Sequence, residues 1–257
     1  MLLGLVALAL FSACQPPAPK TQDPEWVDLF NGKDLTGWTP KISGYPLGEN
    51  VLNVFKVENG VLRVDYSEFG GKFDGRFGHL YYNEPFSHYI LQLEYRFVGE
   101  MLPDAPTWCY RNSGVMVHSQ SAESMGFDQD FPVSLEAQFL STNDSVQQTT
   151  ANLCTPGTHV VVNGKYTEEH CLSSSSKFYR DSVWVKAEVV VRGGEMIYHL
   201  IEGDTVFAYS KPTIGGDHLP ENYPVPVGTA LTSGYIALQA EAQELEFRNV
   251  RIKVLKQ

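Results

Sequence analysis

Apolar and polar residues alternate in short runs along most of the chain, with glycine, proline or asparagine between the runs. The longest run spans residues 89–98, in which every second residue is apolar or aromatic. Because side chains point alternately to the two faces of a strand, this period of two predicts a strand with one buried face. Residues 55–64 form a second run, divided by Asn59-Gly60, a dipeptide typical of a two-residue hairpin turn. The pattern therefore predicts β-strands joined by tight turns.

The same alternation marks further strands up to the C-terminus. We expect them at residues 114–119, 133–140, 183–192, 196–201, 205–209, 234–240 and 245–255. No segment shows the 3.6-residue period of a long amphipathic helix. Many short strands at regular spacing predict an all-β sandwich or barrel, and 257 residues suffice for one large domain of this kind.

Four segments between the expected strands are long and irregular. They are residues 67–78, 100–108, 141–158 and 211–228. Long loops are uncommon in compact domains unless they have a function. We therefore expect a site built from loops at one end of the sandwich, or on the concave face of a bent sheet.

Two of the expected strands carry an apolar side and a polar side. Asn112 and His118 alternate with valines, and Glu136 and Gln138 alternate with Leu, Ala and Phe. A solvated surface is one interpretation of the polar sides, and it is the commoner arrangement in antiparallel sheets. The other is a sugar-binding floor, since these groups offer the donors and acceptors that a polyhydroxyl ligand needs.

The segment 28–38 reads D-L-F-N-G-K-D-L-T-G-W and contains two turn signals, N-G and T-G. Glycine supplies positive φ and asparagine tolerates it, so a tight reversal is expected there. Phe30, Leu35 and Trp38 should attach this turn to the core. The block resembles the opening signature of the 3-keto-disaccharide hydrolase family.

Further segments resemble motifs of that family and occur in the family's order. They are N-S-G at 112–114, E-A-Q at 136–138, G-Y-I-A-L-Q-A-E-A at 234–242 and F-R-N-V-R-I at 247–252, and segments 77–89 and 149–159 resemble one of its subgroups. The resemblance implies a concanavalin-like jelly-roll β-sandwich of two antiparallel sheets with long loops. It also implies a hydrolase or lyase that cleaves 3-keto-glycosides or 3-keto-disaccharides.

The resemblance and the polar faces together give a candidate site. Glu136 is expected to be a general base or a metal ligand, with His79 or His118 as the partner acid or ligand. A divalent cation held by these three residues is the candidate cofactor, and no organic cofactor is expected. The residues expected to bind the sugar are Asn112, Gln138, Asn152, Gln239 and Trp108.

A ketone at C3 of the sugar changes what the site must supply. It acidifies the proton on C2, so one base, one acid and a means of stabilising an enolate suffice for β-elimination and hydration. An ordinary glycosidase would need a second carboxylate beside Glu136. Glu94, Asp128, Asp130 and Glu241 remain open for that role. His159 is expected to lie near the site or to be structural, and His88, His170, His199 and His218 are expected at surface or structural positions.

The first residues have the composition of a targeting segment. An apolar run at residues 2–11 is followed by Ser12-Ala13-Cys14, which resembles a bacterial lipoprotein cleavage site. We expect residues 1–13 to be a signal peptide, Cys14 to be lipidated, and the proline-rich residues 14–25 to be a tether to a domain at 26–257. The protein would then be exported and anchored to a membrane of the bacterial envelope, in the periplasm or on the outer membrane.

Export would place the cysteines in an oxidising compartment. Cys154 and Cys171 flank a hairpin-like stretch, so a disulfide between them is expected, with Cys109 unpaired; three free buried thiols are the alternative.

The charge balance limits the partners of the chain. With 19 Lys and Arg against 30 Asp and Glu the net charge is −11, which disfavours nucleic acid. A sugar or glycoside is the expected ligand. A non-catalytic carbohydrate-binding lipoprotein is the alternative function, because one fold can serve both roles, and a purely structural envelope lipoprotein is a third. An enzyme needs Glu136 buried with a shifted pKa, whereas a binding module does not.

Overall fold

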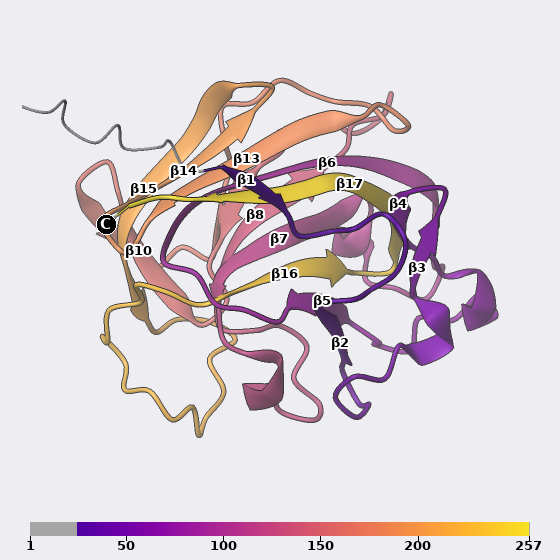
Figure 1. Cartoon of the computed structure of the whole chain (residues 1–257), viewed down its shortest axis with the longest axis horizontal. Coiled ribbons are helices and arrows are strands. Elements are labelled where there is room, and N and C mark those ends of the chain that lie inside the picture. The colour runs from indigo at the N-terminus through magenta and orange to yellow at the C-terminus, as the bar shows by residue number, and fades with distance from the viewer. Residues whose placement is uncertain (1–24, 257) are drawn as a thin grey trace, which may run out of the picture.

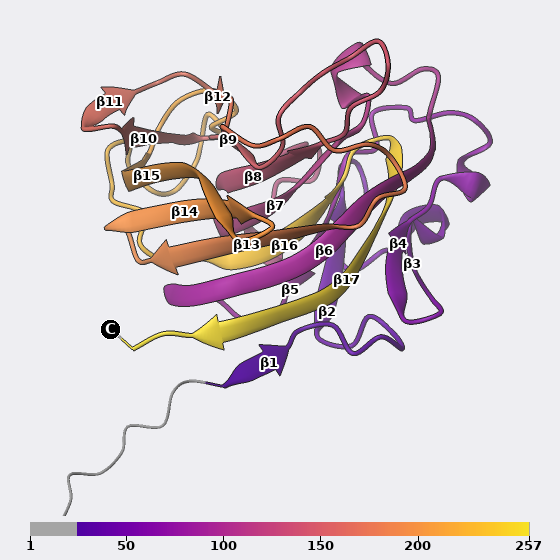
Figure 2. The same ribbon diagram turned by 90° about the horizontal axis from the view of Figure 1, so that it is seen from above.

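The alternating runs form the strands of two antiparallel sheets, which face each other across an apolar core (Figure 1). The structure is a computed structural model that describes residues 25–256. Figure 2 shows the two layers from above, with β6, β13 and β17 in one and β7, β8 and β16 in the other. The expected all-β jelly-roll sandwich is confirmed.

The larger sheet has ten strands. Their order is β11 (Lys165–Thr167), β10 (Thr158–Val162), β15 (Asp204–Ile214), β14 (Met196–Ile201), β13 (Val185–Arg192), β6 (His88–Met101), β17 (Gln243–Val254), β4 (Val61–Val64) and β3 (Phe55–Glu58), with β1 (Trp26–Asp28) paired to β17.

The smaller sheet has seven strands and carries the candidate site. Their order is β12 (Cys171–Leu172), β9 (Asn152–Cys154), β8 (Leu135–Leu140), β7 (Asn112–Ser119), β16 (Tyr235–Ala240), β5 (Gly78–Tyr82) and β2 (Trp38–Ile42). The helical elements of the described residues are four short 3-10 turns, at Val51–Asn53, Ser67–Phe69, Thr107–Cys109 and Ala122–Ser124.

The core is made by the inward-facing residues of both sheets. On β6 the five alternating residues Tyr89, Leu91, Leu93, Tyr95 and Phe97 are all buried, as the sequence predicts. Across the core, Tyr95 stacks on Phe139 of β8 with ring centroids 4.1 Å apart. Since β7, β8 and β16 turn their apolar residues inward, their polar residues lie on the opposite face.

The turn chemistry is also as expected. Asn59 and Gly60 both have positive φ, at 52° and 79°, where they join β3 to β4, and Gly193-Gly194 joins β13 to β14. In the first turn segment Trp38 is buried, and its indole Nε1 donates a hydrogen bond of 2.8 Å to the Leu29 carbonyl. The side chains of that segment therefore attach it to the core.

Two segments expected to be loops contain strands. Residues 211–214 continue β15, which passes Pro212 because the pairing with β10 shifts register there and leaves a bulge. Within residues 141–158, β9 pairs with β8, so that Asn152 lies in the sheet and not in a loop. Neither short polar segment alternates over enough residues to show a strand in the sequence.

The disulfide between Cys154 and Cys171 is confirmed, and Cys109 is a buried free thiol. The two half-cystines are directly opposed residues of β9 and β12, the edge of the seven-stranded sheet. The disulfide therefore attaches β12, and the segment that follows it, to the strand beside Glu136.

No helix within residues 25–256 is long and apolar enough to cross a membrane. The expected signal peptide, Cys14 and all but the last residue of the tether lie outside the described residues.

Replacement of both Cys154 and Cys171 by serine should lower the free energy of unfolding by about 3 kcal/mol, since a loop of this length gains that much freedom in the unfolded chain. Thermal unfolding of the C154S/C171S variant should show a melting temperature about 6–12 °C lower. Reduced wild-type protein should match the variant. An unchanged melting temperature would show that the crosslink adds no stability.

Candidate active site

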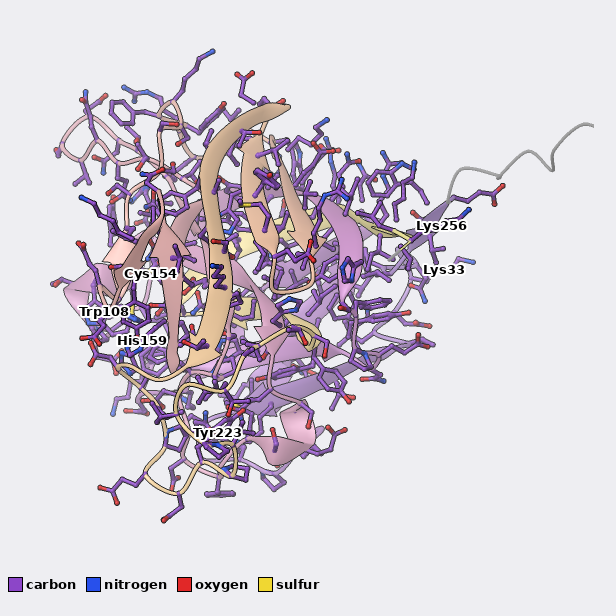
Figure 3. The ribbon with its side chains drawn as sticks, turned by 90° about the vertical axis from the view of Figure 1, so that its left-hand side faces the viewer. Lys33, Trp108, Cys154, His159, Tyr223 and Lys256 are labelled. Atoms are coloured by element: carbon purple, nitrogen blue, oxygen red, sulfur yellow. A yellow bond between two sulfur atoms is a disulfide. The ribbon has the colours of Figure 1, made fainter. Side chains whose placement is uncertain are left out.

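A cavity of about 610 Å³ lies on the face of the seven-stranded sheet that is turned away from the core. Its floor is formed by Asn112 of β7, Glu136 and Gln138 of β8, Gln239 of β16, and Glu241 just beyond β16. Its walls come from loops and include Trp108, Tyr110, Phe131, His170, His218 and the disulfide. Figure 3 shows Trp108 and Cys154 on one side of the molecule, opposite Lys33 and Lys256.

The Glu136 carboxyl group lies over Gly114 of the neighbouring strand. A Cβ atom at position 114 would be 2.2 Å from Glu136 Oε1 and 2.8 Å from its Cγ. The missing side chain of Gly114 thus gives the carboxyl group the space to lean across β7, which separates β8 from β16. Glu136 itself is 6% exposed, so the carboxyl group is largely removed from bulk water.

Glu241 is the second carboxyl group of the cavity. Burial raises the pKa of Glu136 to about 8. Burial, and then the negative charge of Glu136, raises the pKa of Glu241 well above its ordinary value. Within residues 25–256 neither carboxyl group forms an ion pair with a lysine, arginine or histidine. Two negative charges this close in a buried site are unfavourable in free energy, so the pair holds at least one proton at neutral pH.

Several polar atoms of the cavity have no partner in the protein. Asn112 Oδ1, Gln239 Oε1, Glu241 Oε2 and His170 Nδ1 are buried and form no hydrogen bond within residues 25–256. Most buried polar atoms in proteins are hydrogen-bonded, and leaving one unpaired costs about 1–3 kcal/mol. Four such atoms around one cavity indicate a site that is completed by a polar ligand.

Trp108 forms part of an aromatic wall. It is 52% exposed, and its ring stacks on Phe77 with centroids 5.6 Å apart and planes at 3°. Phe131 packs against Phe77 at 5.0 Å and continues the wall. Trp108 thus offers a fixed aromatic surface to the cavity, as expected for a residue that stacks on a sugar ring.

His170 and His218 also line the cavity, contrary to the expectation of surface or structural positions. Their rings are 4.9 Å apart, and His218 packs against Phe131 at 5.3 Å. Burial, and then the proximity of His218, lowers the pKa of His170, so its imidazole is neutral at neutral pH. Both residues come from loops without a motif, so the sequence carried no signal for them.

His79 lies beside the floor of the cavity and not in its lining. It is the cross-strand partner of Gln239, is 1% exposed, and its Nε2 has no hydrogen-bond partner. Burial, and then the charge of Lys41, lowers its pKa to about 3, so it is neutral in the folded protein. Its nearest aromatic neighbours are Tyr81 and Phe131.

The expectation that His118 shares a face with Asn112 was wrong. His118 has a positive φ of 49°, and the pairing of β7 with β16 shifts register beside it. This bulge turns the imidazole toward the other sheet, where His118 Nε2 lies 3.0 Å from the carbonyl oxygen of Gly193. A strict period of two cannot reveal a bulge, so the sequence placed the residue on the wrong side.

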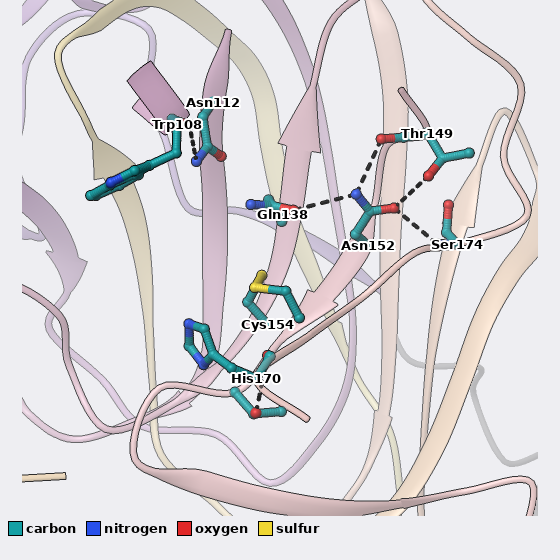
Figure 4. Close-up of a disulfide and its surroundings, with 10 residues drawn as sticks. Trp108, Asn112, Gln138, Thr149, Asn152, Cys154, His170 and Ser174 are labelled. Carbon is teal, nitrogen blue, oxygen red and sulfur yellow. Dashed lines mark hydrogen bonds between the residues drawn. A yellow bond between two sulfur atoms is a disulfide. The ribbon is translucent and has the colours of Figure 1, made fainter. Parts of the chain in front are cut away.

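Asn152 holds Gln138 in position. Asn152 Nδ2 donates to Gln138 Oε1 at 3.3 Å and to the Thr149 carbonyl, and its Oδ1 accepts from Thr149 Oγ1 and from the Ser174 amide (Figure 4). Its amide is thus fully used within the protein, whereas the Gln138 Nε2 group has no partner in the described residues. Asn152 therefore orients Gln138, and Gln138, Asn112 and Gln239 line the cavity.

The expected metal ligands do not come together. His118 contacts the opposite sheet, His79 lies beside the cavity floor, and Glu136 lies over Gly114. Among residues 25–256 no three His, Cys, Asp or Glu side chains are grouped so that they could hold a metal ion. His79, His118 and Glu136 therefore do not fit a shared cation.

The remaining candidates lie away from the cavity lining. Glu94 is paired with Arg248 on the ten-stranded sheet, and neither Asp128 nor Asp130 lines the cavity. His199 is buried between the Ala151 carbonyl and the Tyr209 hydroxyl, which is a structural position. His159 bonds to the exposed Tyr166 and His88 to Ser87. Of the open carboxylates, only Glu241 joins Glu136.

The sequence of the chain places it in a carbohydrate-active, glycoside hydrolase-like class of protein. The chain belongs to the family of 3-keto-alpha-glucoside-1,2-lyase-like domains, whose sequence profile matches residues 25–253. No curated protein matches the chain in sequence.

Solved structures share the fold at low identity. A proposed glycosyl hydrolase from Parabacteroides distasonis is 19% identical, with a TM-score of 0.53, over 90% of this chain and 94% of the other. A second from the same organism is 17% identical, with a TM-score of 0.53, over 90% and 100% of the two chains. A Bacillus subtilis protein of unknown function with a galectin-like fold is 11% identical, with a TM-score of 0.54, over 90% and 96%.

The raised pKa of Glu136 predicts how stability depends on pH. The folded state keeps the proton up to about pH 8, whereas the unfolded chain loses it near its ordinary value of 4.5. Between these values the folded state binds more protons, so its stability falls as pH rises, by about 1 kcal/mol per pH unit for one group. The Glu136→Gln variant should lack this contribution.

Urea unfolding of the wild type and the Glu136→Gln variant at about pH 5, 6.5 and 8 tests this linkage. The stability of the variant relative to the wild type should increase with pH across the series. Parallel curves would show that Glu136 ionises normally in the folded protein.

Proposed function

We propose that this protein cleaves the glycosidic bond of 3-keto-glycosides by β-elimination followed by hydration, with Glu136 and Glu241 as the acid–base pair. The observation that carries the proposal is the pair of buried carboxyl groups in one cavity with unpaired amide oxygens. Family membership supports a substrate of this kind.

The protonation of the pair suits both halves of the elimination. Near pH 8 the pair loses one of its protons, so that one group is a carboxylate that can act as base while the other remains a carboxylic acid. The base removes the C2 proton, which the C3 ketone acidifies. The electron pair of that bond forms a C1–C2 double bond, the C1–O bond breaks, and the acid protonates the leaving oxygen. Water then adds across the double bond and restores a 3-keto sugar.

Other groups of the cavity can bind the sugar and the developing enolate. Gln138 Nε2 and the neutral imidazole of His170 are donors that suit the ketone oxygen, where negative charge develops. The free side-chain oxygens of Asn112 and Gln239 can accept hydrogen bonds from hydroxyl groups of the sugar. In the part of the chain that the structure describes, no lysine or arginine lines the cavity, which favours an uncharged sugar.

Export remains part of the proposal. The Cys154–Cys171 disulfide supports an oxidising compartment, in which such bonds persist. Lipidation at Cys14 and membrane anchoring rest on residues 1–25 of the sequence alone.

A non-catalytic carbohydrate-binding protein is the second candidate. The exposed Trp108 ring favours it, since aromatic surfaces are sufficient for sugar binding. Binding alone gives no use for two buried carboxyl groups with raised pKa values, which cost stability. We therefore rank the enzyme first.

The decisive experiment is NMR of a 3-keto-glucoside incubated with the protein in D₂O, with the unoxidised glucoside as control. Cleavage of the keto sugar alone, with deuterium at C2, is the expected result. If neither sugar is cleaved but both show line broadening, the protein is a binding module.

Substitution of either carboxyl group should remove turnover without unfolding the protein. We expect Glu136→Gln and Glu241→Gln each to lower kcat by about 10²- to 10⁴-fold, as for lost acid or base groups. Glu84→Gln, at an exposed carboxylate outside the cavity, is the matched control. Full activity of either cavity variant would remove that residue from the mechanism.

Gly114→Ala should act through Glu136. The added Cβ meets the flexible carboxyl end of Glu136 and not the backbone, so the fold should lose less than about 1 kcal/mol while the base is displaced. We expect at least a hundredfold loss of kcat. Gly126→Ala, where a Cβ would meet only Gln129 at 3.4 Å or more, is the control. Equal activity of the two variants would contradict the positioning role.

A further inference from the structure

We propose that a second cavity beside the first is the subsite for the leaving group, and that it binds a neutral sugar ring. This inference rests on the proposed function, because it assigns the two sides of the scissile bond. The second cavity has a volume of about 450 Å³, within the range of small-molecule sites.

The two cavities are continuous along the sheet. Gln138, Leu140, Gln148 and Cys171 line both of them. Gln138 stands at the boundary, since its Oε1 accepts from Asn152 on the second-cavity side while its Nε2 is free. A ligand that spans the boundary would place one ring near Glu136 and the next beyond Gln138 toward β9.

The lining of the second cavity selects a neutral, hydroxylated ligand. No charged side chain of the described residues lines it, and its polar groups are amides and hydroxyls, including those of Gln147, Thr149 and Ser173. Amides and hydroxyls supply both donors and acceptors, as sugar hydroxyl groups do. A carboxylate or sulfate on the leaving group would enter without a counter-charge, which is costly.

Phe178 gives this cavity an aromatic surface. Its side chain is 52% exposed although it lines the cavity, and large exposed apolar rings usually indicate an interaction. The backbone on both sides is fixed, because Ser176 Oγ accepts from the Thr150 amide at 2.7 Å and the Tyr179 carbonyl accepts from the Thr142 amide at 2.7 Å. The ring therefore projects from a held segment, as a stacking platform requires.

The disulfide connects the segment 171–178, which carries Phe178, to β9, the strand next to Glu136. Cys171 begins the segment that leads through Leu172 and Ser173 to Phe178, and Cys154 is the cross-strand partner of Glu136. The second cavity is thus held at a fixed position relative to the acid–base pair.

The test compares Phe178→Ala with wild type on two substrates that differ only in the leaving group. One is a 3-keto-glucosyl-glucose disaccharide and the other is methyl 3-keto-glucoside. We expect kcat/KM for the disaccharide to fall about fivefold to tenfold, as for a lost aromatic contact, and to change less than about twofold for the methyl glycoside. Equal effects on both substrates, or no effect on either, would overturn the subsite.

Phe127→Ala is the matched control, since Phe127 is 58% exposed and lines neither cavity. It should leave both substrates unaffected. If the wild type cleaves neither keto sugar, the proposed function fails, and the subsite is tested by saturation-transfer NMR with the unoxidised disaccharide. Loss of signal from the leaving-group glucose ring in Phe178→Ala would still support the subsite, and an unchanged signal would refute it.

Discussion

Two carboxyl groups buried in one cavity, neither paired with a positive charge of residues 25–256, are the constraint around which this site is organised. The sheet can hold them because the apolar side chains of β8 and β16 point into the core, which leaves the opposite face of both strands for the cavity. Gly114 on the strand between them clears the path of the Glu136 carboxyl group. The raised pKa values follow from that burial, and they leave the pair with at least one proton at neutral pH.

Much of the fold and four of the five floor residues could be predicted from the sequence. Alternation identified the faces of β6 and β8, and thereby Glu136 and Gln138, because burial on one side of a regular strand repeats every two residues. It failed for His118, since a bulge breaks the period without any mark in the residues themselves.

The rest of the site depends on contacts between distant segments. The sequence did not distinguish Glu241 from three other candidates for the second carboxylate. Only the pairing of β16 with β7 places Glu241 at the cavity. His170 and His218 come from loops, and loop conformation depends on packing that a single sequence does not display. The position of Asn152 in the sheet could not be predicted, because β9 has only three residues and is too short to show a period. Its amide group positions Gln138 by a hydrogen bond.

The strand order β9, β8, β7 and β16 has a consequence for how such a protein can diversify. Neighbouring strands lie about 4.8 Å apart, so the sheet fixes the backbone spacing of the two carboxyl residues and the amide residues on the cavity floor. The walls, by contrast, are loops, and one of them is fastened by a disulfide. Substitutions and insertions in the wall loops can therefore change which ligands fit the cavity, while the spacing of the floor residues stays constant.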